Sequence, residues 1–143
     1  MFSFSKFIIH VTIPLLAGGC IYIFFRSPDI KMFEWFNTIG IIEIILNLRE
    51  VAQSNINLNS WILYSLPDGL LTYSFTSSMI ILWRNNDRLG KTFIYLPLML
   101  SVLSELLQYF EIISGTFDRN DLSVVLISFL ICNLFLNLKI YET

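Results

Sequence analysis

The chain has 143 residues, of which 55% are hydrophobic and only 14% are charged, and its formal net charge is −2 at pH 7. Soluble domains carry about 25% charged residues. The high hydrophobic content excludes a disordered chain. The presence of only two cysteines excludes a disulfide-built scaffold, and the excess of acidic over basic residues excludes a nucleic-acid binder. It predicts a small integral membrane protein.

Four apolar stretches have the lengths that a membrane favours. A spanning helix needs about 20 mostly apolar residues, and the stretches cover residues 7–25, 66–83, 92–113 and 122–138. The first begins like a signal peptide, but its apolar run continues through residues 21–25, so we expect a retained helix. The sequence predicts an all-α fold, an integral membrane four-helix bundle in a single domain over residues 1–143.

The segment 32–53, between the first two stretches, has apolar residues at helical spacing that are interrupted by polar ones. We expect an amphipathic helix that lies at the membrane interface or packs over the bundle. A re-entrant or spanning segment is the alternative, although Glu43 would then fall at its centre. If other membrane proteins bind this chain, this segment is the expected docking surface.

The distribution of basic residues predicts an orientation in the cell membrane. The short loop after the second stretch holds Arg84, Arg88 and Lys91, whereas the loop after the third holds only Arg119. Since basic loops stay on the cytoplasmic side, both termini are expected to be cytoplasmic and the loop 114–121 to lie outside.

Polar side chains form a stripe on each of the two middle stretches. In the third stretch, residues 101, 104, 105, 108 and 111 share one helical face. In the second, residues 65, 68, 69, 72, 73 and 76 form a matching face. Such stripes in otherwise apolar helices must face each other or a wet cavity. The hydroxyl groups suit helix packing, whereas Glu105 indicates a functional group because a membrane-buried charge is costly.

In the predicted orientation, several of these polar groups approach the outer side together. We expect one outward-opening polar pocket that binds a ligand, formed by Asp68, Glu105, Gln108, Asp118, Arg119 and Asp121. Arg119 is the expected counter-ion of the acidic residues. The alternative interpretation is that Asp118 and Asp121 are loop residues, one of which caps the last helix.

Two short motifs carry a resemblance to a known family. The segments Ser104–Phe110 and Gly115–Leu122, read SELLQYF and GTFDRNDL, resemble the signature of VanZ-like membrane proteins, a Glu-x-x-Gln followed by an aromatic-Asp pair and a second Asp. Asp68 is similar to the family's acidic residue before an earlier span. Val125 and Ser128 depart from the family's Asn and Gly, and its basic residue before the aromatic-Asp pair is absent. The resemblance covers about residues 67–130, and implies a cell-envelope protein linked to reduced sensitivity to glycopeptide-type antibiotics.

Three function classes remain open at this point. The first is an envelope protein that binds a membrane lipid or lipid-linked headgroup in the outward pocket. The second is an intramembrane acid/base enzyme that uses Glu105 with Asp68 or Asp118, and the third is an accessory subunit of a larger membrane assembly. We expect no cofactor, no metal and no nucleic-acid partner, and His10, the only histidine, is expected to be a packed polar residue.

Overall fold

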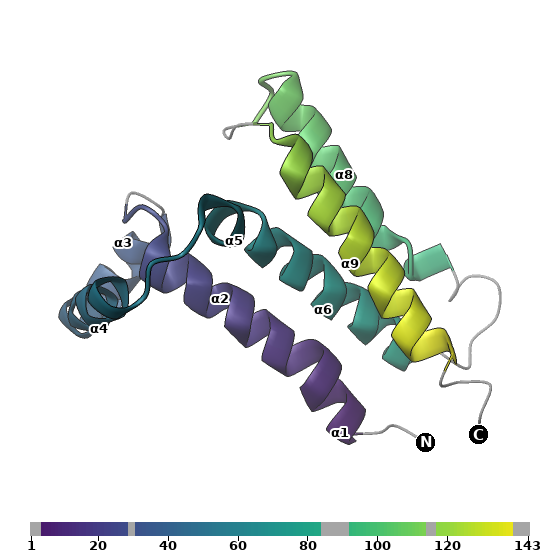
Figure 1. Cartoon of the computed structure of the whole chain (residues 1–143), viewed down its shortest axis with the longest axis horizontal. Helices are drawn as coiled ribbons and strands as arrows, with labels where there is room; N and C mark the ends of the chain where they lie inside the picture. The colour runs from purple at the N-terminus through teal and green to yellow at the C-terminus, as the bar shows by residue number, and fades with distance from the viewer. Residues whose placement is uncertain (1–3, 29–30, 84–91, 114–116, 139–143) are drawn as a thin grey trace.

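The computed structural model describes residues 4–28, 31–83, 92–113 and 117–138, and within these ranges it is helical, with no strand (Figure 1). The all-α class is therefore confirmed. Four long helical units form the body: a rod made of α1 (Phe4–Phe7), the π-helical η1 (Ile8–Thr12) and α2 (Ile13–Phe25), then α6 (Leu66–Trp83), α8 (Leu96–Tyr109) and α9 (Arg119–Leu138). Three further helices in the described ranges connect α2 to α6: α3 (Lys31–Ile39), α4 (Ile42–Asn55) and α5 (Ser60–Tyr64).

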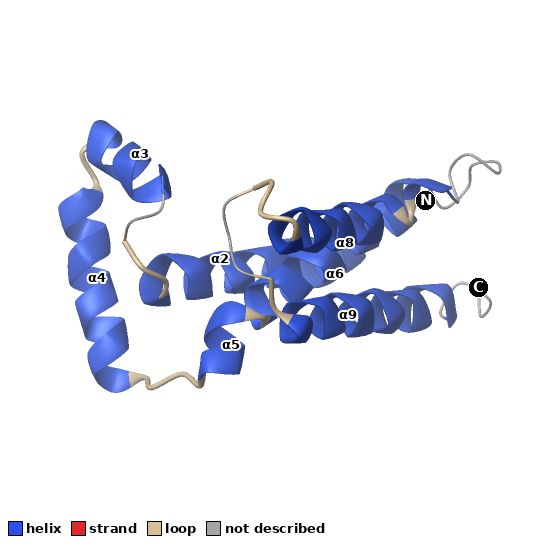
Figure 2. Cartoon of the chain, turned by 90° about the horizontal axis from the view of Figure 1, so that it is seen from above, coloured by secondary structure: helices blue, strands red, loops and turns tan. Residues whose placement is uncertain are grey.

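Helix α6 is the centre of the molecule, because it contacts α2, α8 and α9. The four long units run roughly along one direction, whereas α4 lies across them (Figure 2). The start of α1 and the end of α9 lie at the same end in both views, and α3 and α4 lie at the opposite end. Towards that opposite end the α8–α9 pair diverges from α2 and α6 (Figure 1).

Small residues allow α6 and α9 to approach closely. A Cβ atom added to Gly69 would overlap the Val124 side chain and would lie 2.8 Å from the Ser128 hydroxyl. Further along the same contact, the Ser77 Oγ and Cys132 Sγ lie 3.1 Å apart in the buried core. Small side chains at helix contacts are typical of membrane bundles, where close packing replaces the hydrophobic effect as the driving force.

Polar side chains also join the first rod to α6. The Ser74 hydroxyl donates to the Val11 carbonyl at 2.8 Å, and this acceptor lies in the π-helical turn. At the positions directly before these two residues, His10 Nδ1 and the Tyr73 hydroxyl are hydrogen-bonded at 2.7 Å. His10 is thus a packed polar residue, as the sequence predicts.

The amphipathic segment 32–53 is two helices, and the prediction of one continuous helix is wrong. Gly40 has a φ of +81°, which ends α3 because a helix cannot continue through a left-handed residue. The Ile41 N–H donates to the Phe36 carbonyl and the Gly40 N–H to the Asn37 carbonyl, both at 3.0 Å, which is the Schellman pattern. A glycine within an apolar run is the sequence feature that indicates this break between the two helices.

Helix α4 is fixed to the end of α2 by side-chain donors. Arg49 donates to the Ile23 carbonyl at 2.9 Å and Gln53 to the Phe24 carbonyl at 2.8 Å. These carbonyls belong to the last turn of α2, where helices leave acceptors unpaired. The crosswise position of α4 therefore follows from satisfying the C-terminus of α2.

The apolar lengths of the four helices differ. Two stretches in the described ranges are long and apolar enough to cross a membrane by length and composition, Phe4–Phe25 and Arg119–Leu136. Only 11% of the first and 28% of the second is buried, whereas a soluble core helix would be mostly buried. Helix α6 has 18 residues but carries many hydroxyl side chains. The stretch expected as one span over 92–113 has a turn at residues 94–95, and its helix ends at Tyr109, so α8 keeps only 14 residues.

Candidate functional site

A polar pocket lies at the end of the long helices opposite the start of α1 and the end of α9. It has a volume of about 410 Å³, and its lining comes from all the long helices and the short α5: Arg26, Tyr64, Asp68, Glu105, Gln108, Asp118 and Asp121. Five of the six residues expected from the sequence thus line one pocket, together with two that were not expected. Four acidic side chains and one arginine make this an electronegative site.

Glu105 is the most deeply buried acidic residue of the pocket. Its side chain is only 7% exposed, and Oε2 has no hydrogen-bond partner among the described residues. A buried polar atom without a partner costs roughly 1–3 kcal/mol. An oxygen atom left unpaired in a pocket wall is therefore available to a ligand that supplies a donor.

Asp118 and Asp121 lie where α9 begins. Asp118 Oδ1 accepts a hydrogen bond from the Asn120 N–H at 2.9 Å, so Asp118 caps α9. The predicted alternative that one of these residues is a helix cap is thus confirmed for Asp118. Asp121 lies in the first turn, where the helix dipole favours a negative charge, but its Oδ1 is buried without a hydrogen-bond partner among the described residues.

The arginine in the pocket is Arg26 rather than Arg119. The Arg26 guanidinium lies 4.9 Å from the centre of the Tyr22 ring and 5.3 Å from that of Tyr64, which are cation–π contacts. Arg119, the expected counter-ion, is exposed and is not among the lining residues. Arg26 follows the end of the first apolar run, and it shares the pocket with Asp68 because α2 packs against α6.

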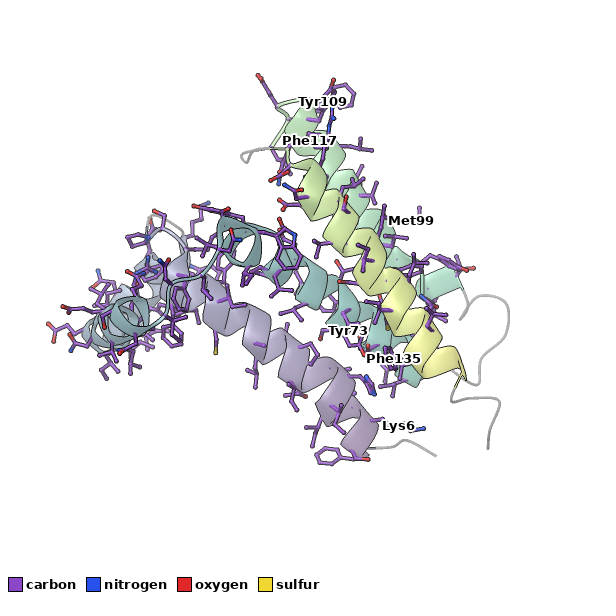
Figure 3. The ribbon with its side chains drawn as sticks, viewed as in Figure 1. Lys6, Tyr73, Met99, Tyr109, Phe117 and Phe135 are labelled. Carbon is purple, nitrogen blue, oxygen red and sulfur yellow. The ribbon has the colours of Figure 1, made fainter. Side chains whose placement is uncertain are left out.

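Glu111 does not belong to the polar stripe of α8, because the helix ends at Tyr109. Glu111 has a φ of +57°, and the Ile112 N–H donates to the Leu107 carbonyl at 2.9 Å, which closes a second Schellman turn. The Glu111 side chain is exposed and does not line the pocket. The Tyr109 and Phe117 rings lie edge to face with centroids 5.3 Å apart, which joins the end of α8 to the residue before Asp118 (Figure 3).

The two polar stripes meet at Thr72 and Ser101, whereas Gly69 of the α6 stripe faces α9 and Tyr73 faces the first rod. Thr72 Oγ1 on α6 and Ser101 Oγ on α8 are 3.0 Å apart, and Thr72 Oγ1 also donates to the Asp68 carbonyl at 2.9 Å. Next to this contact lies a smaller cavity of about 260 Å³, whose polar lining includes Ser101, Ser104, Glu105 and Gln108. Asp68 and Glu105 line both this cavity and the acidic pocket.

An apolar groove adjoins the acidic pocket on its other side. It has a volume of about 360 Å³ and lies between α2, α3 and α6, with the lining Leu15, Gly18, Gly19, Tyr22, Ile23, Met32, Pro67, Asp68 and Leu71. Asp68 therefore lines the groove and the pocket alike. A Cβ atom added to Gly19 would meet nothing within 4 Å, so the groove is open at that point.

Within the described ranges, no three His, Cys, Asp or Glu side chains converge closely enough to hold a metal ion. The two cysteines there, Cys20 and Cys132, are not joined in a disulfide. The arrangement can bind a polar or positively charged group deep among carboxylates and an apolar chain beside it.

Comparisons of the chain with protein-family models, with curated proteins and with solved structures find no match. The resemblance to VanZ-like proteins therefore depends on the motif residues alone.

Proposed function

We propose that this chain is a VanZ-like integral membrane protein of the cell envelope that binds the headgroup of a lipid or lipid-linked molecule in the acidic pocket. The observation that carries the proposal is that Asp68 lines both the acidic pocket and the apolar groove. A polar chamber that adjoins an apolar one fits an amphiphile, with its headgroup in the pocket and its chain in the groove.

Exposed apolar side chains support a membrane location. Large hydrophobic residues are exposed along the three outer helices, for example Leu16 on α2, Met99 on α8 and Leu130 on α9. A soluble monomer rarely exposes contiguous apolar surface beyond a few hundred Å². We propose that α2, α6, α8 and α9 span the bilayer as a four-helix bundle, with the bilayer thinned locally around α8, because α8 is shorter than a typical span.

The orientation follows from the loops and the position of the pocket. If the basic loop 84–91 is cytoplasmic, then both termini are cytoplasmic too. The pocket lies at the end of the bundle away from the start of α1 and the end of α9, so it opens on the outer side of the membrane. Helix α4, across that end, would lie at the outer interface.

Lipid co-purification tests this proposal. The full chain is solubilised in a mild detergent, and native mass spectrometry counts the bound lipids. Gly19→Phe fills the groove where a side chain meets open space, and Gly19→Ala is the matched control. We expect about one retained lipid on the wild type and on Gly19→Ala, and a loss of at least about tenfold in occupancy on Gly19→Phe.

Two other results would contradict the proposal. Equal lipid retention by Gly19→Phe and Gly19→Ala would mean that retained lipid lies outside the groove. A stoichiometric protein partner with no retained lipid would favour the alternative of an accessory subunit.

A further inference from the structure

We propose that the ligand group in the acidic pocket is a primary ammonium carried beside a phosphate, as in a phosphoethanolamine headgroup. This inference depends on the proposed function, since it names the class of headgroup that the pocket receives. It follows from which hydrogen-bond acceptors are unpaired, and from which helix supplies each charge.

Two buried acceptors in the pocket lack donors. They are Glu105 Oε2 and Asp121 Oδ1, which have no hydrogen-bond partner among the described residues. Glu105 is only 7% exposed. Asp68 also lines the pocket, on the side of α6. The ligand must therefore bring several donors, and a positive charge on them would compensate the desolvated carboxylates.

A primary ammonium meets this requirement better than the other common cationic groups. It offers three N–H donors around one charge. A trimethylammonium group has the same charge but no N–H, so it would leave both buried oxygen atoms unpaired. A bare metal ion would need converging ligands, which the described acidic residues do not provide.

Arg26 supplies the complementary site for the phosphate. Its guanidinium is flanked by the Tyr22 and Tyr64 rings, which hold it in position before a ligand arrives. A guanidinium binds phosphate oxygen atoms through paired N–H donors. Tyr64 lines the same pocket.

The order of these sites matches the covalent order of such a lipid. Tyr22 and Ile23 line the apolar groove, Arg26 follows them on the same chain segment, and Glu105 and Asp121 come from α8 and α9 across the pocket. The acyl chain would lie in the groove, the phosphate at Arg26 and the ammonium group at the carboxylates. This is the order in which the three groups are joined in the lipid. Asp68 lies at the junction of groove and pocket.

The test measures headgroup selectivity on the delipidated full chain in detergent. Phosphatidylethanolamine, phosphatidylcholine and phosphatidylglycerol with identical acyl chains are titrated by native mass spectrometry. We expect the ethanolamine lipid to bind at least about tenfold more tightly than the choline lipid, because charged hydrogen bonds are lost. Glu105→Gln should reduce this ratio to below about threefold, whereas Glu111→Gln, an exposed acidic residue outside the pocket, should preserve it.

The remaining outcomes separate the two proposals. If the three lipids bind equally and Gly19→Phe abolishes this binding, the ammonium inference is overturned, whereas the proposed lipid-binding function stands. No lipid binding above that of Gly19→Phe would overturn both. Soluble phosphoethanolamine that binds as tightly as the lipid would support the ammonium site and contradict the lipid.

Discussion

The hydroxyl groups of Thr72 and Ser101 lie 3.0 Å apart and join α6 to α8 one helical turn before Glu105. Because Thr72 donates its proton to the Asp68 carbonyl, Ser101 must donate to Thr72. This short chain of hydrogen bonds fixes the two helices that supply Asp68 and Glu105 to the pocket.

Thr72→Val should destabilise the protein by about 0.5–1 kcal/mol, because it removes this link while preserving the side-chain shape. Ser78→Ala is the control, since within the described part of the chain the Ser78 hydroxyl bonds only to the Phe75 carbonyl of its own helix. Unfolding in detergent measures both variants, and a double-mutant cycle with Ser101→Ala isolates the coupling. Additive effects of Thr72→Val and Ser101→Ala would contradict the link.

Glu105 should show a trade-off between stability and binding. Its buried Oε2 has no partner, so Glu105→Gln and Glu105→Leu should retain or raise the melting temperature while ligand binding falls at least about tenfold. Glu105→Gln is the sharper variant because it keeps the shape and removes only the charge. Full binding by Glu105→Gln, or a loss of stability in both variants, would reduce Glu105 to a packing residue.

Gly69 should tolerate no larger side chain. The added atoms would overlap Val124 and crowd Ser128 on α9, so Gly69→Val should cost about 1–3 kcal/mol through overpacking. Gly19→Val is the matched control on α2, where a Cβ meets open space. Thermal unfolding measures the stability of both variants. An equal loss of stability in Gly69→Val and Gly19→Val would contradict the close contact between Gly69 and α9.

Replacing Glu111, which has a left-handed backbone conformation, by glycine should raise the stability of the protein. A non-glycine residue at this φ costs about 1 kcal/mol, and the side chain is exposed. Glu111→Gly should therefore stabilise the protein by up to about 1 kcal/mol. Glu111→Ala separates conformation from charge, since it removes the carboxylate but keeps the strained Cβ. A stability gain of Glu111→Ala equal to that of Glu111→Gly would assign the effect to charge.

The hydrophobic pattern predicted the helices better than it predicted their ends. The stretch 66–83 coincides with α6, because a long apolar run is visible without knowledge of packing. Gly40 and Glu111 end their helices through left-handed turns. Gly40 is a recognisable signal for such a turn, but Glu111 is not, so a helical face was extended past its end.

The sequence predicts the acidic residues and the glutamine of the candidate site, but not its arginine and tyrosine. Asp68, Glu105, Gln108, Asp118 and Asp121 follow from helical spacing and from the short loop before α9. Arg26 and Tyr64 enter the pocket because α2 and α5 both pack against α6. That contact is a tertiary event which no local pattern encodes.

Site-specific photocrosslinking in intact membranes tests the central claim most directly. A small aliphatic side chain that carries a diazirine replaces Leu15, which lines the groove, or, as the control, Met99, which is 65% exposed on α8 (Figure 3). Both positions should form lipid adducts, and Glu105→Gln should lower the Leu15 adduct at least about fivefold without changing that at Met99. A Leu15 adduct that is independent of Glu105, or one formed with protein instead of lipid, would contradict a lipid whose headgroup reaches the acidic pocket.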